Sequence, residues 1–267
     1  MKKRKISNKL IQELNDLQLS RNKIDEFHYN FVTNSSRYVI FMHEILQTES
    51  NDKLIMVPVS QYIVSLVTCW ETYFRDLFVF LLEMDSEFLE DVVDLNNIQL
   101  NHEELILNNV KPSEFVSKFF NFQNFQDTEQ ALSPLFENKD FFKTVSEYQR
   151  PFILINKRKI GTISLSTLFN NWYETIIEFF EIRHKIVHDA NYRIVVTNKF
   201  ISTAESICIL LPQIIGQFVS EKYNIPRLVI DINNGNIESV TERSSEEIGV
   251  IFTVQDMTAK DWIIVNS

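Results

Sequence analysis

The sequence predicts a mainly α-helical protein with a small antiparallel β-sheet at its C-terminal end. Apolar residues recur at the 3.6-residue period of an amphipathic helix over residues 57–83 and 164–189. After Pro226 the period changes to two, which is typical of strands whose side chains alternate between two faces. The 267 residues, 45% of them hydrophobic, can bury a core in one large domain or two small ones.

The N-terminal part of the chain is expected to be helical. Residues 6–48 should form one or two helices, because their leucines keep helical spacing. Residues 57–83 form the clearest helix, and Pro58 suits its first turn, where a backbone N–H has no partner within the helix. We therefore expect a region of N-terminal helices at 1–50, ahead of the main domain.

The main helical domain is expected to span residues 51–224, with a less regular helical insert at about 84–160. Short helical patches are expected in the insert at 86–94, 112–120, 128–136 and 139–148. A long helix over 164–189 follows the insert. The next helix, from about 197 to 223, tolerates Pro212 with a kink.

Residues 225–267 are expected to form the small C-terminal β region. Residues 228–232 and 237–241 flank an Asn-Asn-Gly-Asn segment, a pattern typical of a hairpin. Two further strands are expected at 249–254 and 262–265.

Composition limits the kinds of phosphate chemistry that are open to this chain. Its four glycines are far apart, whereas a phosphate-binding loop or a dinucleotide fingerprint needs several close together. Any phosphate chemistry must therefore use side chains or helix ends. The net charge of −10 argues against broad, nonspecific coating of nucleic acid, but a local basic site depends on clustering. The basic clusters are Lys157, Arg158 and Lys159, and Arg183, His184 and Lys185 with Arg193.

A cytoplasmic location is expected. Cys69 and Cys208 lie in apolar helical patterns and are expected to be buried and reduced. The basic residues at 2–5 resemble the start of a signal peptide, but no apolar segment follows them. Pro212 interrupts the most apolar run, so no membrane span and no membrane partner are expected.

The segment most informative about function is Glu-Ile-Arg-His-Lys-Ile-Val-His-Asp at 181–189. At about 100° per residue, Arg183 falls in the middle of an apolar stripe. That stripe comprises Leu165, Leu168, Phe169, Trp172, Ile176, Phe180 and Val187. Because a guanidinium stays charged, and burying it unpaired is costly, Arg183 must have a partner or line a cavity or interface. His188 lies about 140° away around the helix, so two chains would form a cleft from these residues better than one.

Arg183 and His188 form an Arg-x-x-x-x-His element near the end of a long helix, and an earlier helix carries Glu71-Thr-Tyr-Phe-Arg-Asp-Leu. This combination resembles HEPN domains (higher eukaryotes and prokaryotes nucleotide-binding). The helix around Glu71 is most similar to bacterial defence-associated members. The resemblance covers about 57–90 and 160–223 and implies a HEPN-like up-and-down helical bundle. The chain departs from many members at His184, where they have Asn or another small polar residue.

The resemblance implies a metal-independent endoribonuclease that acts as a homodimer and needs no cofactor. His188 would transfer the proton of the ribose 2′-OH, and Arg183 would stabilise the charge on the phosphoryl oxygens. A need for the 2′-OH would restrict cleavage to RNA. Such an enzyme is expected to be a toxin or abortive-infection effector in antiviral defence, with an antitoxin or defence-system protein as a further partner.

The remaining candidate residues have supporting roles in this hypothesis. His184 would orient the cleft or bind phosphate, and Glu71 would orient Arg183 or His188 across the helix pair. Asp189 is a further accessory residue. Candidate RNA contacts are Lys185, Arg193, Lys157, Arg158 and Lys159.

Each of these residues also has an alternative explanation. Arg183 could form a buried structural ion pair with Glu71 or Asp189, and His188 could be a terminal residue favoured by the helix dipole. Glu71 could be an ordinary helix-edge residue and the Lys157 cluster a solvated loop. Glu181, His184 and His188 share one helix face at a spacing that a metal ion could use.

Two function classes stand beside the ribonuclease. One is a noncatalytic HEPN-type module that binds RNA, a nucleotide or a partner protein. The other is a scaffold or antitoxin-like interaction protein, for which the C-terminal sheet and the Phe-rich insert would be the surfaces.

Overall fold

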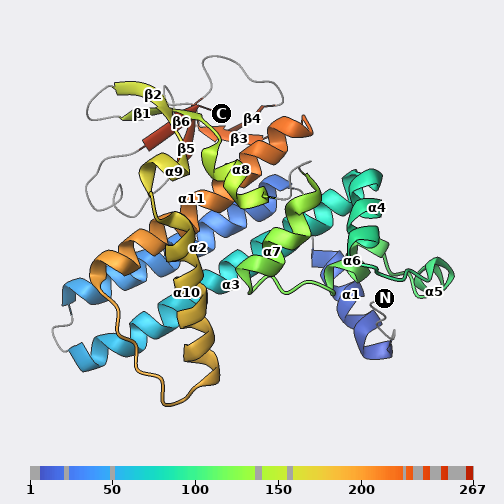
Figure 1. Cartoon of the computed structure of the whole chain (residues 1–267), viewed down its shortest axis with the longest axis horizontal. Coiled ribbons are helices and arrows are strands. Elements are labelled where there is room, and N and C mark those ends of the chain that lie inside the picture. Colours follow the sequence, from blue (N-terminus) through green and yellow to red (C-terminus); the bar gives the residue numbers. More distant parts are fainter. Residues whose placement is uncertain are drawn as a thin grey trace. The chain divides into compact units, whose positions relative to one another are not determined.

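The computed structural model is mainly helical within the residues that it describes (Figure 1). These are residues 7–20, 24–48, 52–135, 140–154, 159–224, 227–230, 237–240, 248–251 and 263–266. The helices are α1 (Asn8–Ser20), α2 (Ile24–Thr48), α3 (Asp52–Met84), α4 (Ser86–Leu95), α5 (His102–Leu107), α6 (Pro112–Ser117), α7 (Phe125–Leu132), the 3₁₀ turn η1 (Ser133–Leu135), α8 (Phe141–Glu147), α9 (Leu165–Leu168), α10 (Trp172–His188) and α11 (Asn198–Lys222). The predicted predominance of helix is therefore confirmed.

The described strands pair in two antiparallel groups. They are β1 (Arg150–Leu154), β2 (Lys159–Ile163), β3 (Arg227–Ile230), β4 (Ile237–Val240), β5 (Ile248–Ile251) and β6 (Ile263–Asn266). One sheet has the order β2-β1-β6-β5, and β3 pairs with β4. Ile153 of β1 stands opposite Ile264 of β6, so the pairing joins C-terminal residues to a segment that we had placed in the helical insert. A short apolar run such as 152–154 does not distinguish strand from helix by its period alone.

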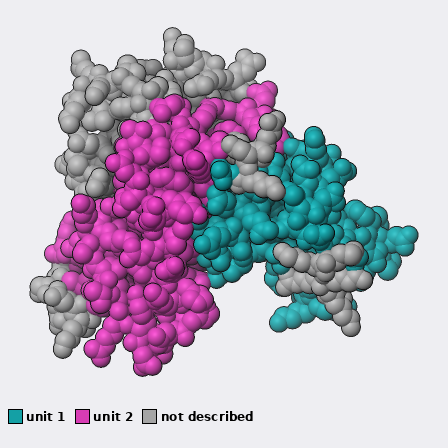
Figure 2. All heavy atoms as spheres, viewed as in Figure 1, with its two compact units in different colours: residues 1–27, 71–141 teal, residues 28–70, 142–267 magenta. Residues whose placement is uncertain are grey.

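The chain forms two compact units, coloured separately in Figure 2. Unit 1 comprises residues 1–27 and 71–141, and unit 2 comprises residues 28–70 and 142–267. Helix α3 passes from unit 2 into unit 1 after Trp70. Each unit therefore contains segments that are distant in the sequence.

Unit 1 contains two apolar groups. Leu10 and Leu14 of α1 pack with Leu105, Val110 and Phe115. A second group is aromatic: the ring of Phe78 in α3 lies 5.0–5.9 Å from three others, those of Phe88, Phe120 and Phe122. The phenylalanines of the insert are thus used as core, because aromatic side chains at that density are costly to leave in water.

Asparagines set the boundaries of several short helices in unit 1. The Asn101 and Asn124 side chains accept hydrogen bonds from backbone N–H groups at the first turns of α5 and α7. Asn97 and Asn109, which follow α4 and α5, have φ values of 49° and 55°. Asn tolerates this left-handed conformation better than most residues, which explains where these helices stop.

In unit 2, aromatic residues join three helices. The buried Trp70 of α3 meets Phe180 of α10 edge-on, with ring centroids 5.4 Å apart, and Phe142 of α8 at 6.1 Å. Helices α10 and α11 also pack against each other. The core of unit 2 therefore fixes α10, the helix that carries the Arg183 motif.

Two predicted helix boundaries were wrong. The helix expected over 164–189 is interrupted, because Phe169 is extended and α10 starts anew after Asn171. The Asn170–Asn171 pair has weak helix propensity and suits a helix start, a signal that the apolar period concealed. Helix α3 begins at Asp52, so Pro58 lies inside the helix rather than in its first turn.

Among the described helices, α11 is long and apolar enough to cross a membrane by length and composition alone. However, 76% of its most apolar 18-residue window is buried inside the protein, as in a core helix. The sequence-based expectation of no such segment treated Pro212 as the end of the apolar run, whereas the apolar helix continues through it.

Candidate functional site

Arg183 is buried in the last turns of α10. It is 9% exposed and lies on the same side of the helix as the buried Phe179 and Phe180. Its Nε is inaccessible to solvent and has no hydrogen-bond partner among the described residues. The described part of the chain also contains no ion pair of Arg183. The guanidinium is therefore held in a place where its charge lacks a partner from those residues.

His188, the last residue of α10, is exposed. The structure thus places Arg183 and His188 on different sides of the helix, as the predicted angle between them requires. The exposed ring of His184 lies one turn before His188, with the two ring centroids 4.5 Å apart. Helix C-termini favour cationic side chains, so this end of α10 is a suitable place for both imidazoles.

Asp189 ends α10. Its backbone is extended, and its side-chain Oδ1 accepts a hydrogen bond of 2.9 Å from the backbone N–H of Asn191. The backbone N–H of Tyr192 bonds the Asp189 carbonyl at 3.0 Å, which closes a turn. These are the local bonds by which Asp competes with helix formation. The Asp189 carboxylate thus accepts a hydrogen bond from the backbone. It forms no ion pair with Arg183.

The candidate RNA contacts beside the motif are exposed. Lys185 lies near the end of α10, with its Nζ 5.9 Å from the centre of the Tyr192 ring. Arg193 lies in the segment that leads to α11. Lys157 and Arg158 fall outside the described residues, and Lys159 begins β2.

The apolar stripe around Arg183 differs from the one predicted. Val187 is 47% exposed and Leu168 37% exposed, although both were assigned to the stripe. The predicted residues Trp172, Ile176 and Phe180 are buried, and the buried face of α10 also includes Thr175, Phe179 and Ile182. The break at Phe169 places Leu165 and Leu168 in α9, outside α10, and Val187 lies in the last turn of α10. The last turn of α10 therefore exposes a valine next to His188.

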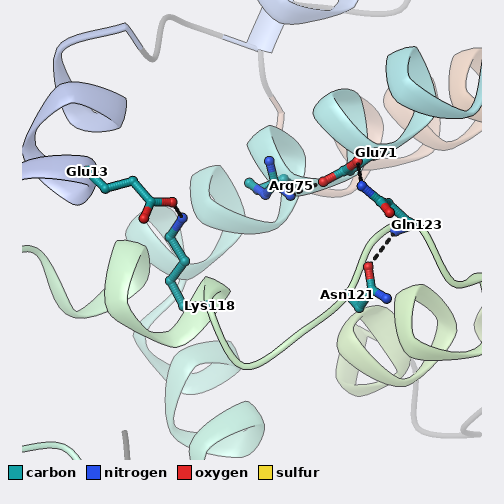
Figure 3. A network of polar contacts seen from close by, with 6 residues as sticks. All are labelled: Glu13, Glu71, Arg75, Lys118, Asn121 and Gln123. Carbon is teal, nitrogen blue, oxygen red and sulfur yellow. Dashed lines mark hydrogen bonds and ion pairs between the residues drawn. The ribbon is translucent and has the colours of Figure 1, made fainter. Parts of the chain in front are cut away.

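Glu71 belongs to a separate polar network in unit 1, shown in Figure 3. Its carboxylate pairs with Arg75, four residues along α3, and accepts a hydrogen bond from the Gln123 side chain. The Gln123 backbone N–H in turn donates to Asn121 Oδ1 at 3.1 Å. Both Glu71 oxygens thus have partners within unit 1, one of which is 52 residues distant in sequence.

Glu181, His184 and His188 do not form a metal site in the structure. No group of three or more His, Cys, Asp or Glu side chains that could hold a metal ion occurs among the described residues. The two histidines contact each other through their rings, as stated above, and Glu181 is exposed.

Comparison with known proteins adds no assignment. No family model, no curated protein and no solved structure matches this chain.

Proposed function

We propose that this protein is a metal-independent endoribonuclease of the HEPN type that acts as a homodimer. The helices would form a HEPN-like up-and-down bundle with the C-terminal residues as an appended antiparallel β region. The further role proposed for it is a toxin or abortive-infection effector in bacterial defence, in the cytoplasm, with an antitoxin or other defence protein as its partner.

The observation that supports the proposal most is the state of Arg183. A structural arginine in a core has a carboxylate or several carbonyl partners, because an unpaired buried charge is costly. Arg183 has neither among the described residues. An arginine kept in this state is better explained by a ligand whose negative charge completes the site, such as a phosphodiester.

The chemistry would divide between the two motif residues. His188 is exposed at the helix end, where its imidazole can reach a substrate and accept the 2′-OH proton. Attack of the 2′-oxygen on the adjacent phosphorus then forms a 2′,3′-cyclic phosphate and breaks the bond to the 5′-oxygen of the next nucleotide, which takes a proton from an imidazolium or from water and leaves as a 5′-OH. Arg183 would stabilise the charge on the non-bridging oxygens in the transition state.

The homodimer supplies what a single α10 lacks. Arg183 and His188 lie on different sides of one helix, so a second copy would bring an imidazole of one chain and a guanidinium of the other around one phosphate. The single chain already buries Arg183, so burial by itself does not require the partner. The exposed Val187 beside His188 offers apolar contact area for such a symmetric interface.

RNA cleavage in excess chelator tests the proposal. The wild type should cut single-stranded RNA to products with a 2′,3′-cyclic phosphate and a 5′-OH. His188→Ala should lower the rate by about 10²–10⁴-fold, as expected for loss of a positioned acid–base group. Because His188 is exposed, the variant should keep the wild-type circular dichroism and thermal midpoint.

A matched control is His102→Ala, which removes an exposed histidine of unit 1 and should cut RNA at the wild-type rate. The ribonuclease assignment fails if cleavage needs added divalent metal or if His188→Ala is fully active. RNA binding without cleavage by the wild type would favour the noncatalytic module instead.

A further inference from the structure

A second set of ionisable side chains lies inside unit 2, on helices α2, α3 and α11. Its centre is Glu205 of α11, which is 2% exposed. One of its carboxylate oxygens, Oε1, has no hydrogen-bond partner among the described residues. The nearest basic group is His43 of α2, whose Nε2 is 3.9 Å from that oxygen. This separation is within reach of an ion pair but too long for a hydrogen bond.

The surroundings of the carboxylate penalise its charge. Burial raises the pKa of Glu205, and His43 opposes that shift. Cys208, one turn further along α11, is fully buried, and burial raises the pKa of its thiol well above the ordinary value. The charges of Glu205 and of Cys69, in α3, raise the Cys208 pKa further. Among the described residues, His43 is therefore the single basic side chain paired with Glu205.

The pair has two kinds of state, which differ by one proton. With one proton, it is either a carboxylate beside an imidazolium or a neutral carboxyl group beside a neutral imidazole, and its net charge is zero. Without that proton, a carboxylate remains buried with no countercharge. A buried, unpaired charge is the least favourable of these arrangements. His43 is 31% exposed, so its imidazole can exchange protons with solvent.

We propose that the His43–Glu205 pair is a proton-dependent lock that holds α2 against α11. The helices stay packed while the pair carries one proton, and loss of that proton lets α2 separate locally from α11. Helix α11 also packs against α10, so the lock acts on the neighbour of the motif helix. The inference does not depend on the ribonuclease proposal, because it concerns packing within unit 2.

The direction of the pH dependence follows from linkage. A carboxyl group whose pKa is higher in the folded state than in the unfolded state stabilises the fold at low pH. That contribution is lost as pH rises through the folded-state value, which lies above the ordinary 4.5. The α2–α11 contact should therefore weaken as pH increases.

Hydrogen exchange of the full-length protein, corrected for the intrinsic effect of pH, tests the lock. In the wild type, peptides that cover α2 and the start of α11 should lose protection between pH 6 and pH 8.5 by more than the reference peptides do. Peptides from α4 to α7 in unit 1 serve as the internal reference. In Glu205→Gln, the protection of α2 should stay high at both pH values, because no buried carboxylate can form.

Two further variants complete the test. His43→Gln removes the countercharge, so α2 should lose its protection at a lower pH than in the wild type. His102→Gln, at an exposed position of unit 1, should behave as wild type. Glu205→Met fills the same place with an apolar side chain and replaces Glu205→Gln if the latter does not fold. The lock is refuted if the wild type and the Glu205 variants share one pH profile, or if His43→Gln matches the wild type throughout.

Discussion

Replacing Arg183 with methionine is expected to stabilise the protein while it removes RNA cleavage. Arg183 is buried, and its Nε lacks a partner among the described residues. Methionine keeps a long, flexible, apolar side chain that can fill the same space. The substitution therefore removes an uncompensated charge without opening a large cavity.

The size of the effect follows from the unpaired group. A buried donor without a hydrogen bond costs about 1–3 kcal/mol, so the free energy of unfolding should increase by about that amount. For a chain of this size, 1 kcal/mol corresponds to roughly 2–4 °C, so the thermal midpoint should rise by roughly 2–12 °C. Gain of stability with loss of activity is the pattern expected of a functional rather than a structural residue.

Urea denaturation followed by circular dichroism measures the change, and the chelator-resistant cleavage assay measures activity. Arg193→Met is the matched control, because Arg193 is an exposed arginine of the same unit. Its free energy of unfolding should change by no more than about 0.5 kcal/mol, as for other surface substitutions.

A decrease in the free energy of unfolding of Arg183→Met would contradict a functional role for Arg183. If Arg183→Met lowers the free energy of unfolding by about 2 kcal/mol or more, Arg183 has a structural partner that the substitution leaves unpaired. The structural ion-pair explanation would then replace the functional one.

Three other substitutions or reactions test the structure. Trp70→Ala should lower the free energy of unfolding in urea by about 3–5 kcal/mol, because Trp70 is fully buried against Phe142 and Phe180; a loss below about 1 kcal/mol would contradict that packing. Burial raises the pKa of Cys69 to about 11. Its alkylation by iodoacetamide at pH 8 should therefore be about 100-fold slower than that of a free cysteine, and should accelerate as pH rises. Alkylation at the rate of a free cysteine would show that the thiol is accessible. Glu71→Gln should lower the free energy of unfolding by about 0.5–1 kcal/mol, because the pair with Arg75 is partly exposed. A double-mutant cycle with Arg75→Gln that gives no coupling energy would exclude the pair.

The candidate site was predictable in part. The apolar period placed Arg183 on the buried side of its helix and His188 away from it, and the structure agrees. The sequence could not show that Arg183 lacks a partner, because partners in a core come from other helices. The proposed role of Glu71 shows the same limit. Its position at the edge of the apolar face was correct, but its bond to Gln123 depends on how the insert folds back on α3.

Some helix boundaries were predicted wrongly because the apolar period was given more weight than local sequence signals. The Asn170–Asn171 pair marked the break before α10. Other features had no local signal. Glu205 and His43 lie in helical segments far apart in the sequence, and the carboxylate was not expected to be buried beside an imidazole.

The sequence by itself determined that this protein is mainly helical and where most of its helices lie. Helical hydrogen bonds join residues four apart, so the information needed is local and survives in the spacing of apolar residues. Only the tertiary structure decided the pairing of β1 with β6, the network around Glu71 and the burial of Glu205. These contacts join residues that are distant in the chain, and they depend on which surfaces meet once the helices have formed.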